Sequence, residues 1–161
     1  MLTKKVEEIC NRQIEREGFS SNLYLAMGSW AEAKGLSGIA AWLYAQSDEE
    51  RAHMLKFIKW VNERGGNAII PEFKKPPVTY KGIPEVFAEV LKHEQFITAS
   101  INEVLEVAIA EKDHATANWI QWFVKEQVEE ESSAQHIIDK LDLAGQHGVY
   151  FLDRDIMKLR G

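Results

Sequence analysis

The feature that most constrains the fold is the stretch "GGNAIIPEFKKPPVTYKG" (residues 65–82), which separates two pairs of long helical segments. Its three prolines and its glycines exclude a helix there. On both sides of it, apolar residues recur at alternating spacings of three and four, the pattern of a helix with one buried face. About eighteen residues are enough to cross the full length of a helical bundle.

The four periodic segments have recognisable ends. They run over residues 3–34, 37–64, 84–112 and 113–144, with Gly35 and Gly145 as C-terminal glycines, Pro84 as a first helical residue and Asp113 as an N-cap. Short turns make the first two segments, and the last two, antiparallel neighbours. We therefore predict an all-α, antiparallel four-helix bundle with one long crossover between helices two and three. A short fifth helix is expected near residues 150–159, and residues 1–161 are expected to form one domain.

Composition narrows the class of function. The net charge of −6 argues against nucleic acid as a partner, because phosphate binding requires a basic surface. The single cysteine, Cys10, excludes a cysteine cluster for zinc or iron–sulfur and fits a reducing compartment. No apolar run is long enough for a signal peptide or a membrane span. We expect a cytoplasmic protein.

A carboxylate interrupts the apolar stripe of every long segment near its middle. The carboxylates and the polar residues beside them on these stripes are Glu17; Glu50 and His53; Glu94; and Gln127 and Glu130. Buried carboxylates need partners, because desolvating each charge costs several kcal/mol. No lysine or arginine lies in the central part of any stripe.

The hairpins bring these carboxylates to a common depth. Each lies between fifteen and nineteen residues from the turn of its own hairpin, or about 22 to 29 Å along a helix. The predicted result is a cluster inside the bundle that two cations would neutralise. Carboxylates with one imidazole suit iron or manganese better than zinc or copper. Glu50 could bridge two metals while His53 binds one of them.

With these residues the whole chain resembles the bacterial non-haem ferritins. The stretches that carry the resemblance are "EREGFSSNLY" (15–24), "DEERAHM" (48–54), "KHEQFITASIN" (92–102), "NWIQWFVKEQVEEE" (118–131) and "IDKLDLAG" (138–145).

The resemblance implies a ferroxidase centre with two irons per subunit. By position, the ligands of the first iron would be Glu17, Glu50 and His53. Those of the second would be Glu50, Glu94 and Glu130, with Gln127 beside them. Tyr24 matches a tyrosine next to the centre, and Trp122 matches a nearby aromatic residue.

The resemblance also implies a third iron site on the inner side of the subunit. Its ligands would be Glu49, Glu126, Glu129 and Glu130. The same run of acidic residues could instead be a solvated helix face, and both readings remain open here. Four other histidines, His93, His114, His136 and His147, are expected at the surface rather than at a metal.

The expected function is therefore iron oxidation and storage. Members of this family use oxygen or peroxide to oxidise Fe(II) and deposit ferric oxide-hydroxide in a shell of 24 subunits. Haem is not expected, because the fourth segment has Gln127 and Glu130 in place of a second E-x-x-H and Arg51 follows Glu50. Two alternatives are a di-iron oxidase or peroxide reductase of the same fold, and a helical bundle that only buffers metal or binds a partner.

Two smaller features also call for a structural reason. Gly18 lies inside the first segment, where it costs about 1 kcal/mol relative to alanine. A close contact with another helix would explain it. Cys10 lies on the buried stripe and is expected to be a small core residue.

Overall fold

The computed structural model describes residues 1–160, which are helical except for their connections. The helices are α1 (Lys4–Ala33), α2 (Ser37–Glu63), α3 (Ile83–Ala110), α4 (His114–Trp119), α5 (Gln121–Ala144) and α6 (Gly148–Asp155), with 3-10 turns at Gly145–His147 and Ile156–Leu159. None of these helices is both long enough and apolar enough to cross a membrane.

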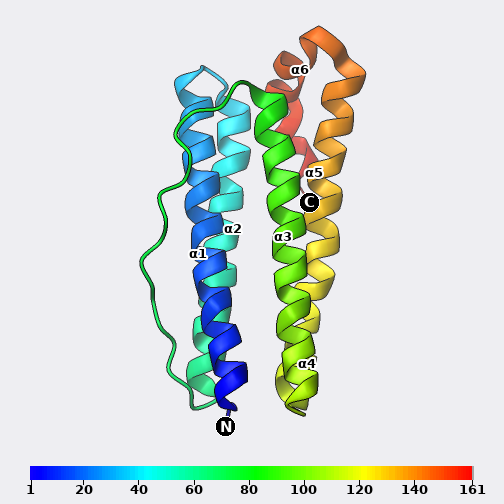
Figure 1. The fold of residues 1–161 in the computed structure, drawn as a ribbon. Coiled ribbons are helices and arrows are strands. Elements are labelled where there is room, and N and C mark those ends of the chain that lie inside the picture. The colour runs from blue at the N-terminus through cyan, green and yellow to red at the C-terminus, as the bar shows by residue number, and fades with distance from the viewer. Residues whose placement is uncertain (161) are drawn as a thin grey trace.

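The long helices form an antiparallel four-helix bundle, as predicted (Figure 1). α1 and α2 make one hairpin, and α3 makes the other with α4 and α5. The connection between α2 and α3 runs along the outside of the first hairpin, from one end of the bundle to the other. Gly35, in the first hairpin turn, has a φ of +78°, which a residue without a Cβ adopts at little cost.

The crossover is held against α1 by side-chain contacts. The Asn11 amide donates to the Asn67 carbonyl at 3.0 Å and accepts from the Ile69 amide at 2.8 Å. Farther along, the ring of Phe73 lies so close to Gly18 that a Cβ there would be 2.3 Å from it. The close contact expected at Gly18 is therefore present, but its nearest neighbour is the crossover rather than another long helix.

The fourth long segment differs from the prediction of one continuous helix over residues 113–144. Asp113 caps α4 as expected, accepting from the Thr116 amide, but the helix is interrupted at Ile120. Ile120 is fully buried, and the Trp119 ring beside it stacks on Trp60 with ring centroids 4.8 Å apart. The interruption thus coincides with large rings packed at this end of the bundle, a tertiary feature that local sequence does not encode.

The C-terminal tail also differs slightly from its predicted boundaries. α6 begins at Gly148 and ends at Asp155, and a separate 3-10 turn, Ile156–Leu159, follows it. The tail folds back against α2 and α5 and buries Leu152 and Ile156. Its backbone passes so close to α2 that a Cβ on Gly38 would be 1.8 Å from the Asp153 carbonyl oxygen.

The hydrophobic core is divided into two clusters. One includes Met27, Leu43 and Phe87, and the other includes Ile14, Phe57 and Ile101. Buried carboxylates lie between the two clusters in the sequence of every long helix. The bundle therefore has apolar packing on both sides of a polar layer.

Candidate metal centre

The carboxylates predicted from the four stripes do converge inside the bundle. Glu17 comes from α1, Glu50 and His53 from α2, Glu94 from α3 and Glu130 from α5. Each is buried, with Glu130 the most accessible at 7%. Two groups of ligand atoms result, each with its atoms within 4.8 Å of one another: Glu17, Glu50 and His53, and Glu50, Glu94 and Glu130.

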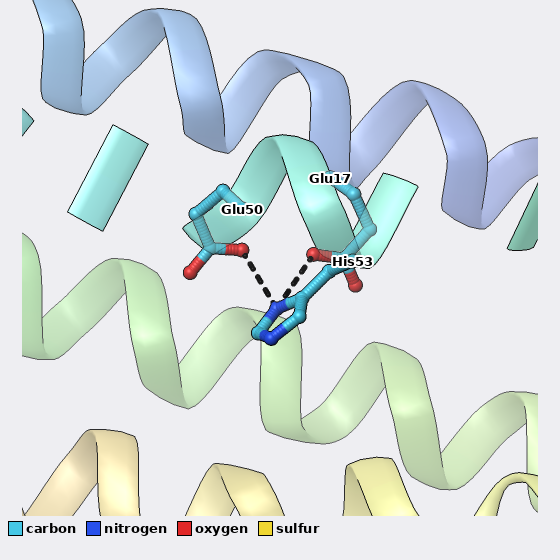
Figure 2. Close-up of side chains that lie close together, drawn as sticks. All are labelled: Glu17, Glu50 and His53. Atoms are coloured by element: carbon cyan, nitrogen blue, oxygen red, sulfur yellow. Dashed lines mark ion pairs between the residues drawn. The ribbon is translucent and has the colours of Figure 1, made fainter. Parts of the chain in front are cut away.

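The first group is arranged around the His53 imidazole. Figure 2 shows Glu17 and Glu50 reaching its Nδ1 atom from two sides. Glu50 Oε2 is 3.3 Å from Nδ1, and Glu17 Oε2 is 3.9 Å from it. Burial lowers the pKa of His53, partly offset by Glu17. The imidazole is therefore in the neutral form that binds metals.

The second group is held by neighbouring hydrogen-bond donors. The Tyr24 hydroxyl donates to Glu94 Oε1, and the Gln127 amide donates to Glu94 Oε2 at 3.0 Å. The Gln46 amide donates to Glu130 Oε2 at 2.9 Å. Tyr24 remains a donor, because burial and the nearby Glu94 raise its pKa well above the usual range.

The three carboxyls of the second group hold protons unusually strongly. Burial, and then Glu94 and Glu17, raise the pKa of Glu50 well above its ordinary value. Burial raises the pKa of Glu94 to about 7, although hydrogen bonds from Tyr24 and Gln127 oppose the change. Burial and nearby carboxylates raise the pKa of Glu130 to about 8. These carboxyls therefore resist being ionised together unless a cation is bound among them.

The donor set fits divalent cations. Glu17 Oε2 and Glu50 Oε1 are buried and have no hydrogen-bond partner among the described residues. Such an oxygen costs free energy unless a partner is supplied. A cation within each group would supply it, and oxygen ligands with a single imidazole favour iron or manganese.

A third group lies next to the second. It contains Glu49, Glu126 and Glu130, with ligand atoms within 4.8 Å of one another. The resemblance implied Glu129 as a further ligand, but Glu129 is exposed and its carboxylate is not among these ligand atoms. Glu129 does line the open pocket of about 310 Å³ onto which the group faces.

Arg160 also lies at this third group, which the sequence did not suggest. Its guanidinium donates to Glu49 Oε2 at 2.6 Å and to Gln46 Oε1 at 2.7 Å. The tail therefore brings a positive charge to this acidic group. The central parts of the buried stripes on the long helices contain no lysine or arginine that could do so. Only the fold of the tail places Arg160 there.

Aromatic residues surround the His53 side of the centre. The rings of Trp122 and Phe123 lie edge-on to His53, with centroids 5.5 and 5.6 Å away. Lys56 places its ammonium 3.0 Å from the Trp122 ring centroid. Trp122 is thus near the centre, as the resemblance implied, but has no ligand atom to offer.

His93 corrects another expectation. It is half-buried rather than fully exposed: its ring is hydrogen-bonded to Ser20 Oγ at 2.7 Å, and burial lowers its pKa to about 4. It belongs to none of the three groups of ligand atoms. Cys10 is fully buried, as expected.

Two glutamines contact the ligands and were not singled out from the sequence. Gln46 bonds to Glu130, and Gln13 donates to Glu17 Oε1 at 2.7 Å. Both are buried and lie on the same helical stripes as the carboxylates. The signal that could have found them is a polar residue one helical turn before a buried glutamate.

Comparison with known proteins gives a consistent result. Residues 7–144 match the Ferritin-like domain family. The chain is 40% identical over 161 residues to a bacterial non-heme ferritin of Campylobacter jejuni, covering 99% of this chain and 96% of that one. It is 38% identical over 161 residues to a bacterial non-heme ferritin of Escherichia coli, covering 99% and 98%.

A solved structure shares the fold. An open pore ferritin from the archaeon Archaeoglobus fulgidus superposes with a TM-score of 0.94 at 40% identity. The match covers 99% of this chain and 98% of the archaeal one.

Proposed function

Because the chain belongs to the ferritin family, we propose that it is a ferroxidase that oxidises Fe(II) and stores the product as a ferric mineral. Glu17, Glu50 and His53 hold one ferrous ion, and Glu50, Glu94 and Glu130 hold the second. Iron is thus the substrate, and the oxidant is oxygen or hydrogen peroxide.

The observation that carries this proposal is the position of Glu50. It belongs to both groups of ligand atoms, and its Oε1 has no partner among the described residues. One carboxylate shared by two cation positions is the arrangement of dinuclear carboxylate sites in helical bundles. Two adjacent ions can deliver two electrons together.

The electrons and protons of the reaction balance in a simple way. Each ferrous ion loses one electron, and one dioxygen gains both electrons and two protons to become hydrogen peroxide. If peroxide is the oxidant, it gains the same electrons and protons and its O–O bond breaks to give two waters. Tyr24 and Gln127 orient Glu94 throughout, and the neutral His53 supplies a nitrogen ligand.

The storage part of the proposal requires a shell. Several large apolar side chains are exposed on the isolated chain, and subunit contacts in a shell would cover them. They are Ile70, Val78, Ile109, Val128, Leu143 and Tyr150. We propose the 24-subunit assembly of the family, in the cytoplasm.

The third group is proposed as a site that receives iron beside the centre. Glu49 and Glu126 share Glu130 with the second position, so an ion could pass between the two without leaving carboxylate ligands. Glu129 is retained only as a residue that lines the approach to this group.

The decisive experiment mixes the purified, metal-free protein with ferrous iron in air. Ferric absorbance gives the rate and stoichiometry, and light scattering gives the particle mass. We expect fast oxidation of about two to three irons per subunit. We also expect a particle of about 24 subunits that stays soluble at high iron loading.

Other outcomes would identify the competing functions. Fast oxidation that saturates at two irons on a monomer or dimer would indicate a di-iron oxidase or peroxide reductase and contradict storage. Binding without fast oxidation would leave only a metal buffer. The first alternative is weakened because Glu50 and His53 are the only E-x-x-H pair within one long helix of the described residues, and Gln127 and Glu130 occupy the equivalent spacing on α5.

A further inference from the structure

A chain of hydrogen bonds reaches Glu17 from the side of α1 and α3. Arg16 Nη1 donates to Ser100 Oγ at 2.8 Å, and Ser100 Oγ is bonded to Gln13 Oε1. Gln13 Nε2 then donates to Glu17 Oε1 at 2.7 Å. Gln13 is fully buried, and Glu17 and Ser100 are 1% and 3% exposed.

The direction of this chain is set by its two ends. A guanidinium has donors and no acceptor, so Ser100 Oγ must accept from Arg16. At the other end, the Glu17 carboxylate accepts from the Gln13 amide, so the Gln13 amide oxygen faces Ser100 and accepts its single hydroxyl hydrogen. Arg16 is itself held by Glu103 Oε2 at 3.3 Å.

The two oxygens of Glu17 consequently have different tasks. Oε1 accepts the Gln13 hydrogen bond, whereas Oε2 has no hydrogen-bond partner and lies 3.9 Å from His53 Nδ1. A glutamate side chain free to rotate could present either oxygen, or both. The bond from Gln13 leaves only Oε2 directed towards the His53 side of the centre.

We propose that Gln13 is a positioning residue for the first ferrous ion. Anchored through Ser100 by Arg16, its amide holds Glu17 so that Oε2 is the single oxygen presented to the ion shared with Glu50 and His53. The inference rests on the proposed ferroxidase function and extends it to residues that contact no metal. Hydrogen-bonded partners of this kind typically change metal affinity by about 10- to 100-fold.

The test is an anaerobic calorimetric titration of the assembled, metal-free protein with ferrous iron. Gln13→Leu removes the amide and keeps a similar volume. Gln135→Leu is the matched control, because Gln135 donates to Asp139 four residues later in the same way, but on the exposed surface of α5. Ser100→Ala removes the hydroxyl that orients Gln13, and Ser100→Thr keeps it.

We expect two tight ferrous sites per subunit in the wild type and in Gln135→Leu. In Gln13→Leu, one site should weaken by about 10- to 100-fold and the other should keep its affinity. Ser100→Ala should weaken ferrous binding at the same site to a smaller extent. Ser100→Thr keeps the hydroxyl and should bind at that site with the wild-type affinity. If ferrous affinity is lost at one site only and the particle still assembles, the effect is one of positioning. A general structural role would weaken both sites or prevent assembly.

If the Gln13→Leu variant binds both ferrous ions with affinities within twofold of the wild type, the inference is wrong. The ferroxidase proposal would then remain intact. If Gln13→Leu does not assemble, the Ser100 variants decide. Equal ferrous affinity of Ser100→Ala and Ser100→Thr would then overturn the inference. A wild type without two tight ferrous sites would overturn the proposed function itself, and the inference with it.

Discussion

Glu50 lies at the meeting point of two groups of ligand atoms, and its environment explains why a carboxylate there needs a cation. It is 1% exposed, and the Glu17 and Glu94 carboxylates both raise its pKa. No lysine or arginine comes from the central stripes of the helices to offset these charges. The residue is therefore suited to binding iron and costly to the fold of the metal-free protein.

Replacing Glu50 by alanine should remove a ligand from both iron positions at once. We expect the initial rate of ferrous oxidation to fall by roughly 100-fold or more. The particle should remain assembled, because the change also removes repulsion from the cluster. Stopped-flow ferric absorbance together with light scattering measures both properties.

Glu106→Ala, on the exposed surface of α3, is the control and should oxidise iron at the wild-type rate. If Glu50→Ala retained fast oxidation, the assignment of the centre would be wrong.

The raised carboxyl pKa values predict how the stability of the metal-free protein depends on pH. Glu94 and Glu130 titrate at about 7 and about 8 in the fold, whereas a glutamate in the unfolded chain titrates near 4.3. The folded state therefore binds more protons within this range, and stability must decrease as pH rises. His53 and His93, whose pKa values are lowered in the fold, have the opposite effect, mainly below the ordinary histidine pKa of about 6.5.

Between pH 6.5 and about 8 the carboxyls dominate the pH dependence of stability. The Tm of the metal-free protein should therefore fall as pH rises across this range. Glu130→Gln should flatten this slope, and divalent cations should raise Tm more at pH 8 than at pH 6.5. Differential scanning calorimetry gives all three comparisons. A Tm that is constant or rises across this range would show that these carboxyls are ionised without a cation.

Among the elements, α6 has a structural role at the start of α2. The N-cap residue of α2, Leu36, provides no side-chain acceptor. Asp153 of α6 provides one instead, since its Oδ1 accepts from the Ile39 amide at 2.9 Å. The two elements approach so closely at Gly38 that no other residue type fits without movement of the backbone.

Gly38→Ala should therefore push α6 away from α2. We expect a loss of about 1–3 kcal/mol in the free energy of unfolding, as for other overpacked sites. The tail should also be cut faster in limited proteolysis. Gly82→Ala is the matched control, because its φ of 173° is ordinary extended backbone and its added Cβ would meet Pro84 at 3.7 Å. Equal stability of the two variants would mean that α6 moves away at no cost.

On the scale of the whole molecule, the tail connects the end of the chain to the third acidic group. Arg160 bonds to Glu49 and Gln46, and Gln46 bonds in turn to Glu130. A cation that uses Glu49 must compete with the guanidinium for the same carboxylate. The affinity of this group therefore depends on an element distant in sequence.

Arg160→Gln should strengthen cation binding at the third group. We expect roughly fivefold tighter binding of the third ferrous ion, since a partly exposed ion pair contributes about 1 kcal/mol. Lys158→Gln is the control, because Lys158 pairs with Asp155 on the same tail and does not contact the group. Anaerobic calorimetry resolves the third binding event. Weaker or unchanged binding in Arg160→Gln would show that Arg160 does not compete with iron.

The sequence by itself determined the bundle, its long crossover and the depth at which the carboxylates meet. These follow from helical periodicity, from the prolines and glycines that end helices, and from the constant rise per residue, all of which are local. The same arithmetic placed Glu17, Glu50, His53, Glu94 and Glu130 together, because each hairpin aligns residues equally far from its turn. The structure brings these side chains together, and their role as iron ligands remains a prediction.

Only the tertiary structure decided which neighbours complete the centre. On α5, Glu129 lies outside the third group, the folded tail brings Arg160 to that group, and Ser100 on α3 bonds to Gln13 on α1. The Trp60 ring that stacks on Trp119, and the Phe73 ring that contacts Gly18, likewise come from positions far away in sequence. Contacts of this kind depend on side-chain packing between elements, and helical spacing carries no information about it.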